Sequence, residues 1–204
     1  MKYYLSSYEL GNKADKLRKL ALKGKIGYIP NARDFINSDP ERKERRTTND
    51  MNSLRELGLE VELLNIQGYF GKRDELRKKL EELGSIFISG GNVFILRQAM
   101  KLSGLDEILK ELQGTDFLYA GYSAAGCVLA SSLKGMDIVD PLETPYASQK
   151  EIIWDGLGFV DFHFMPHWDS NHPESADIEK EIAYCKENNI PYKAIRDGEV
   201  IIIE

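Results

Sequence analysis

A serine placed between an apolar stretch and a run of small residues is the most specific chemical signal in the sequence. Ser123 lies within G-Y-S-A-A-G (121–126), directly after apolar residues that predict a strand. A serine at a sharp strand-to-helix turn can present its hydroxyl as a nucleophile, and the N-terminus of the following helix stabilises negative charge there. Helix capping is the competing interpretation of Ser123, because serine is a common N-cap residue.

A pair of glycines marks the end of the preceding predicted strand, in S-G-G-N (89–92). Consecutive glycines let backbone N–H groups face an anion. Loops at the carboxyl ends of adjacent strands share one crevice in an open α/β sheet. We therefore expect the amides of Gly91 and Ala124 to converge as an oxyanion hole, with Asn92 nearby as a substrate contact. A plain strand-to-helix turn is the alternative.

All three histidines fall within ten positions, at His163, His167 and His172. His167 follows a predicted strand, so its imidazole could meet the Ser123 hydroxyl as a general base. We expect His163 to pack within that strand, and His172 to cap a helix, support the site or contact substrate. Histidines are also zinc ligands, but a proline between the first two excludes a regular helix across them. We predict no metal and no cofactor.

A serine–histidine pair needs an acid that holds the imidazole in one tautomer and stabilises its cation. Asp197 ends an apolar stretch at a turn, where an ordinary turn aspartate is the competing interpretation. Asp137, Asp140 and Asp169 are further candidates, and spacing alone does not decide among the four.

The elements that must position these residues alternate between strands and helices. Strands are predicted at 3–8, 25–32, 61–66, 85–89 and 117–122, and helices at 12–23, 38–57, 72–83, 93–102, 105–112 and 123–131. Five successive βα units predict a three-layer α/β/α fold, with an open, mostly parallel sheet and helices on both faces.

The last third of the sequence is less regular. A turn-rich connection at 133–158 precedes a predicted strand at 159–165 and a helix at 173–188, capped by Asn171 or His172. The stretches 192–196 and 200–203 flank Asp197-Gly198, a pair typical of hairpin turns, so we predict a C-terminal β-hairpin. Because no linker interrupts the pattern, residues 1–204 are interpreted as one domain.

Composition excludes several classes of function. The 204 residues include 27 Lys and Arg and 33 Asp and Glu, a net charge of −6 that argues against nucleic acid as the main ligand. The basic stretch E-R-K-E-R-R (41–46) is interpreted as a solvated helix face rather than a phosphate contact. The absence of a long apolar run, of a signal peptide and of a cysteine framework predicts a soluble cytoplasmic protein without membrane contact.

Taken together, these segments resemble the peptidase E family, aspartyl dipeptidase-like serine peptidases related to cyanophycinases, whose fold is like that of class I glutamine amidotransferases. The resemblance spans nearly the whole chain and rests on S-G-G-N-V-F (89–94), G-Y-S-A-A-G (121–126), M-D-I-V-D-P (136–141), M-P-H-W-D (165–169) and A-I-R-D-G (194–198). It implies Ser123 as nucleophile, His167 as base, Asp197 as acid and a small peptide as substrate. We expect a monomer or a homodimer.

Several positions depart from the family pattern. Ala125 replaces a glycine, Lys134-Gly135 stand where aspartyl dipeptidases carry an aspartate, and residues 173–179 contain no arginine. The resemblance therefore implies a peptidase for short peptides without strict aspartyl specificity. An esterase or amidase on a non-peptide acyl substrate, and a non-catalytic small-molecule-binding protein on the same scaffold, are the alternatives.

Overall fold

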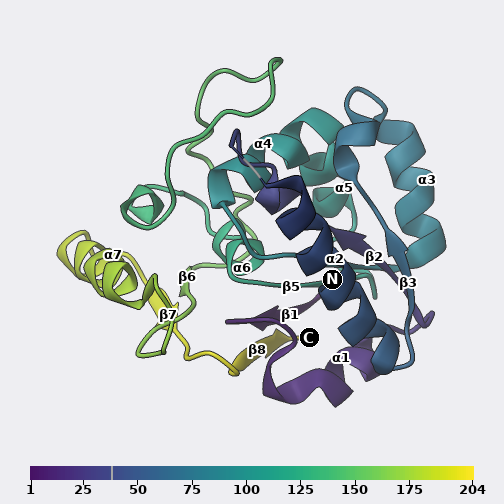
Figure 1. Ribbon diagram of the computed structural model, residues 1–204, viewed down its shortest axis with the longest axis horizontal. Coiled ribbons are helices and arrows are strands. Elements are labelled where there is room, and N and C mark those ends of the chain that lie inside the picture. Colours follow the sequence, from purple (N-terminus) through teal and green to yellow (C-terminus); the bar gives the residue numbers. More distant parts are fainter. Residues whose placement is uncertain (38) are drawn as a thin grey trace.

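A six-stranded sheet forms the centre of the computed structural model, which describes residues 1–37 and 39–204 (Figure 1). Its strands are β1 (Lys2–Ser6), β2 (Lys25–Ile29), β3 (Glu60–Leu63), β4 (Ser85–Ile88), β5 (Leu118–Tyr122) and β8 (Val200–Ile203). They lie in the order β3-β2-β4-β5-β1-β8, and only β8 runs antiparallel to its neighbour. The predicted open, mostly parallel sheet is confirmed.

Helices cover both faces of this sheet (Figure 1). They are α1 (Ala14–Leu20), α2 (Pro40–Glu56), α3 (Arg73–Leu83), α4 (Val93–Ser103), α5 (Leu105–Glu111) and α6 (Ala124–Cys127), with 3-10 turns at Gly11–Lys13, Asn31–Arg33, Ile66–Tyr69 and Met136–Ile138. One apolar cluster packs α1 and α2 against the sheet. A larger cluster packs α3, α4, α5 and α6 against the sheet. The three predicted layers are therefore present.

The sequence explains these elements locally. In β4, Ile86 and Ile88 belong to the larger cluster and Phe87 to the smaller one, as expected of a strand that is buried on both faces. Asp39 caps α2 by accepting a hydrogen bond from the backbone N–H of Arg42 at 3.1 Å, and Pro40 begins the helix. The predicted start of this helix, Ser38, lies outside the described residues.

The C-terminal strands correct the predicted hairpin. β7 (Tyr192–Ala194) pairs in parallel with β6 (His163–Met165), whereas β8 joins the main sheet antiparallel to β1. The turn between them is a corner connecting two sheets, because the Asp197 carboxylate accepts a hydrogen bond from Ser7 and its backbone N–H donates to Ser170. The apolar β8 covers the edge of β1 that would otherwise be unpaired.

Pairing between two backbone segments shortens two of the predicted elements. The helix after Ser123 ends at Cys127, because the carbonyls of residues 128–130 accept hydrogen bonds from backbone N–H groups of residues 157–160. The same pairing keeps Phe159 and Val160 out of β6, which begins at His163.

The last helix, α7 (Ser175–Glu187), begins after the predicted position, and neither Asn171 nor His172 is its N-cap. Glu174 holds that place, and its backbone N–H donates to the His172 ring at 3.3 Å. Within residues 1–37 and 39–204, no helix is both long and apolar enough to cross a bilayer.

Candidate active site

Ser123 occupies a strained turn between β5 and α6. Its backbone has φ 50° and ψ −112°, which lies outside the usual left-handed region for a residue with a side chain. The backbone N–H of Ser123 donates to the carbonyl of Ser6 at 3.2 Å, so the turn is anchored to β1. This sharp strand-to-helix turn is the geometry expected for an exposed nucleophile.

The glycine loop after β4 lies against this turn. A Cβ at Gly90 would come within 3.2 Å of Ser123 Cβ, and one at Gly91 would lie 2.3 Å from the carbonyl oxygen of Ala32. Gly91 also has φ 147°, which favours glycine. Among the described residues, the backbone N–H groups of Gly91 and Ala124 donate to no acceptor, so both are available to a developing oxyanion.

Asn92 has a positioning role in this loop. Its side-chain oxygen accepts from the backbone N–H of Ile95 at 3.0 Å, and its amide nitrogen donates to the carbonyl of Pro141 at 2.6 Å. The side chain is completely buried and caps α4. Its hydrogen bonds therefore fix the loop, and the predicted contact with substrate stays a prediction.

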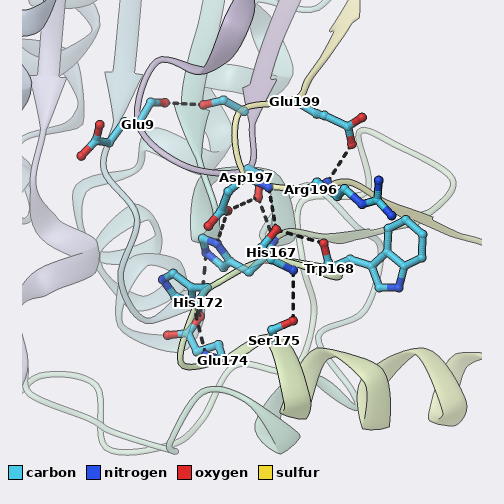
Figure 2. Close-up of polar contacts among 12 residues, drawn as sticks. Glu9, His167, Trp168, His172, Glu174, Ser175, Arg196, Asp197 and Glu199 are labelled. Atoms are coloured by element: carbon cyan, nitrogen blue, oxygen red, sulfur yellow. Dashed lines mark hydrogen bonds and ion pairs between the residues drawn. The ribbon is translucent and has the colours of Figure 1, made fainter.

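His167 follows β6 and lies beside Asp197 (Figure 2). Its Nδ1 is 2.7 Å from Asp197 Oδ1. Ser7, at the end of β1, accepts a hydrogen bond from the His167 backbone N–H at 2.7 Å and donates to the same Asp197 oxygen at 2.8 Å. Since a carboxylate only accepts, Nδ1 carries the proton and Nε2 is left as the acceptor.

The other three candidate acids lie elsewhere. Asp137 accepts from the backbone N–H of Gly135, and Asp140 accepts from that of Val93. Asp169 forms an ion pair with an arginine two positions after β7. Of the four carboxylates, Asp197 is the one that contacts the His167 ring.

Burial lowers the pKa of His167 below its usual 6.5, and the hydrogen bond that Asp197 accepts from its ring opposes that shift. Burial also raises the pKa of Asp140, another of the candidate acids, to about 7. A neutral imidazole at His167 near neutral pH is the protonation state that a general base requires.

His172 and Glu174 lie next to the His167 ring (Figure 2). The two imidazoles stack with centroids 3.7 Å apart and planes 9° apart. Glu174 Oε2 is 3.9 Å from His167 Nε2 and 4.0 Å from His172 Nδ1. His163, as predicted, packs in its strand, with Nδ1 3.7 Å from the Cys185 sulfur.

His167, His172 and Glu174 could hold a metal ion, since their donor atoms lie within 4.8 Å of one another. Two imidazoles and a carboxylate suit zinc. Zinc–ligand bonds of about 2.1 Å require donors roughly 3.4 Å apart, so the cluster would have to contract around the ion. A bound ion would occupy Nε2 of His167 and compete with proton transfer there.

Ser123 and His167 line one cavity of about 410 Å³. The glycine loop, His172 and Glu174 contribute to its walls. The described hydrogen bonds do not include one between Ser123 Oγ and His167. The structure thus brings the predicted nucleophile, the predicted base and one predicted oxyanion donor, Gly91, to one cavity, with Asp197 behind the base.

Sequence reasoning missed two residues of this arrangement. Ser7 bridges His167 and Asp197, and the available signal was a serine at the end of the strand next to β5. Glu174 lies two positions after His172, inside the predicted helix 173–188, and no motif in the sequence marked it as a site residue.

The chain matches the model of peptidase family S51 over residues 8–204. It is 28% identical over 156 residues to an uncharacterized peptidase of Listeria innocua serovar 6a, covering 73% of this chain and 72% of that protein. It is also 27% identical over 146 residues to peptidase E of Streptomyces coelicolor, covering 69% of this chain and 57% of that protein.

Two crystal structures share the fold. A candidate peptidase E protein from Listeria monocytogenes EGD-e has a TM-score of 0.71 at 22% identity, with 100% of this chain and 98% of that chain covered. A peptidase from an acI-B1 Actinobacterium has a TM-score of 0.70 at 17% identity, with 100% and 83% covered. At these identities the two structures establish the fold.

Proposed function

The chain belongs to peptidase family S51, the family of peptidase E, and from this premise we propose that it hydrolyses short peptides through Ser123, His167 and Asp197. The observation that carries the proposal is the 2.7 Å contact between His167 and Asp197 in a cavity that Ser123 also lines. The unengaged amides of Gly91 and Ala124 support it.

The reaction begins when the Ser123 hydroxyl comes within about 2.6–3.2 Å of His167 Nε2. Ser123 Oγ attacks the substrate carbonyl and its proton passes to Nε2, while Asp197 stabilises the imidazolium through Nδ1. The carbonyl oxygen, now negative, accepts from the amides of Gly91 and Ala124. Collapse of the intermediate breaks the C–N bond, and His167 returns its proton to the leaving amine.

Water completes the cycle. His167 takes a proton from a water molecule that attacks the acyl-Ser123 ester, and the serine hydroxyl is regenerated when the imidazolium gives that proton back. No step needs a metal ion or an organic cofactor.

The test combines Ser123→Ala with labelling by a fluorophosphonate probe. The parent should label at Ser123 and cleave members of a dipeptide library, and Ser123→Ala should do neither while keeping its thermal unfolding transition. Ser131→Ala is the matched control, since Ser131 is an exposed serine outside the cavity. Peptide cleavage by Ser123→Ala at the parental rate would refute the mechanism, and cleavage of esters alone would replace the peptidase with an esterase.

A further inference from the structure

The cavity above Ser123 has a basic wall that the proposed mechanism does not use. Arg33, Arg42, Lys43 and Arg46 line it, the last three from the first turns of α2. A cluster of cations beside a nucleophile attracts a negatively charged part of a substrate, provided that the protein itself does not neutralise it.

Two of these cations are already neutralised. The buried Arg33 lies 2.8 Å from Asp50 and also donates to the hydroxyl of Tyr28 at 3.1 Å. Lys43 forms an ion pair with Asp34. The positive charges of Arg33 and Lys43 are therefore balanced within the protein and contribute little to binding an anionic ligand.

Arg42 and Arg46 differ from them. They lie four positions apart, which places them on one face of α2, and both are exposed. In the part of the chain that the structure describes, neither forms an ion pair with an acidic side chain. Arg45, between them but outside the cavity, pairs with Glu41 at 3.4 Å. The helix thus presents two unneutralised guanidinium groups to the cavity.

The position of Arg46 indicates which part of the substrate it meets. Tyr8 and Arg46 both line the cavity, and the Tyr8 ring centroid is 6.1 Å from that of His167. Burial raises the pKa of the Tyr8 hydroxyl, and the positive charge of Arg46 opposes that rise. His167 protonates the leaving amine, so the leaving residue lies on the His167 side of Ser123.

We propose that Arg42 and Arg46 bind a carboxylate of the leaving residue, so that the enzyme prefers peptides whose leaving residue carries a free negative charge. This rests on the proposed peptidase function. The planar guanidinium group matches a carboxylate with two parallel hydrogen bonds. The carboxylate is either the free C-terminus of a dipeptide or an acidic side chain, and a cavity of about 410 Å³ has room for a substrate of that size.

The test compares three peptides that share the best-cleaved N-terminal residue: one ending in free Ala, its C-terminal amide, and the amide with Asp as the leaving residue. The parent should cleave the free acid about tenfold or more faster, in kcat/KM, than the Ala amide, as expected for charge-assisted hydrogen bonds. Recovery of the rate with the Asp amide would show that a side-chain carboxylate can replace the C-terminal one. In Arg42→Gln/Arg46→Gln the preference should fall to within about twofold, and Arg45→Gln should keep it.

Binding to Ser123→Ala separates this proposal from the catalytic one, because it needs no turnover. Calorimetric titration of the free acid and the amide into this variant, with and without the two arginine substitutions, should show the same preference. Equal affinity for acid and amide, or a preference that survives both substitutions, would overturn the arginine assignment and leave the serine mechanism intact. If the parent hydrolyses none of the peptides but Ser123→Ala still binds the free acid more tightly than the amide, the serine mechanism alone is overturned.

Discussion

The strained backbone of Ser123 makes a prediction about stability that can be separated from catalysis. At φ 50° and ψ −112°, a residue with a Cβ is held in a sparsely populated conformation. Such strain costs on the order of 1–3 kcal/mol and is maintained by the surrounding structure. Here the anchors are the hydrogen bond from Ser123 N–H to β1 and the close glycine loop.

Ser123→Gly should therefore be more stable than Ser123→Ala, although both lack the nucleophile. Glycine relieves strain of about 2 kcal/mol, from the middle of the usual range, and loses about 0.4–1 kcal/mol through the greater entropy of its unfolded chain. The net gain is about 1 kcal/mol, which corresponds to a rise of roughly 2–4 °C in Tm for a chain of this size.

Urea and thermal unfolding of the two variants measure this difference directly. Ser131 has an ordinary negative φ, so Ser131→Gly should be less stable than Ser131→Ala and gives the matched control. If Ser123→Gly proves less stable than Ser123→Ala, which is the order expected at Ser131, the backbone of the Ser123 turn is not strained.

Three further predictions concern protons and metal. Because burial lowers the pKa of His167 and the base must be neutral, kcat/KM of the parent should rise with pH along a limb centred below pH 6.5. Asp197→Asn should move that limb to lower pH and reduce kcat by roughly 10⁴-fold, which pH–rate profiles of parent and variant would measure. Burial raises the pKa of Glu181 from 4.5 to about 8, so the native state keeps a proton that the unfolded chain releases, and stability is lost as pH rises through this window. Glu181→Gln should remove that loss, on the order of a few kcal/mol by denaturant unfolding at pH 9, and parallel stability–pH curves for parent and variant would contradict it. Zn²⁺ should inhibit hydrolysis reversibly by binding His167, His172 and Glu174, and His172→Ala should need more zinc for half-inhibition of its own rate; equal sensitivity would place the ion elsewhere.

Much of the fold was predictable because its signals are local. Most strands of the five βα units are short apolar runs, although β3 is E-V-E-L. Gly84 and Gly104 directly follow α3 and α4, and Gly58 lies two positions after the end of α2. Ser123 and His167 could be proposed because each follows a strand, and the carboxyl ends of adjacent strands share a crevice. Local sequence therefore gave the order of elements and the side of the sheet that carries the site.

The contribution of α2 could not be predicted in the same way. The stretch 41–46 was interpreted as a solvated helix face, and for Arg45 that holds. Arg42 and Arg46 line the cavity because α2 lies beside the end of β5, where the Tyr122 hydroxyl donates to Asp50 at 2.9 Å. Periodicity shows which residues share a face but not what the face meets.

The wrong prediction of the C-terminal hairpin has the same origin, and it bears on the proposed chemistry. In a hairpin, Asp197 would lie at the exposed tip of a turn. Because β8 pairs with β1, the backbone N–H of Ser7 donates to the carbonyl of Glu199, and this holds the turn beside the end of β1. Asp197 then reaches both Ser7 and the His167 ring. The antiparallel edge strand is therefore what brings the acid to the base, and a hairpin closed on itself would have separated them.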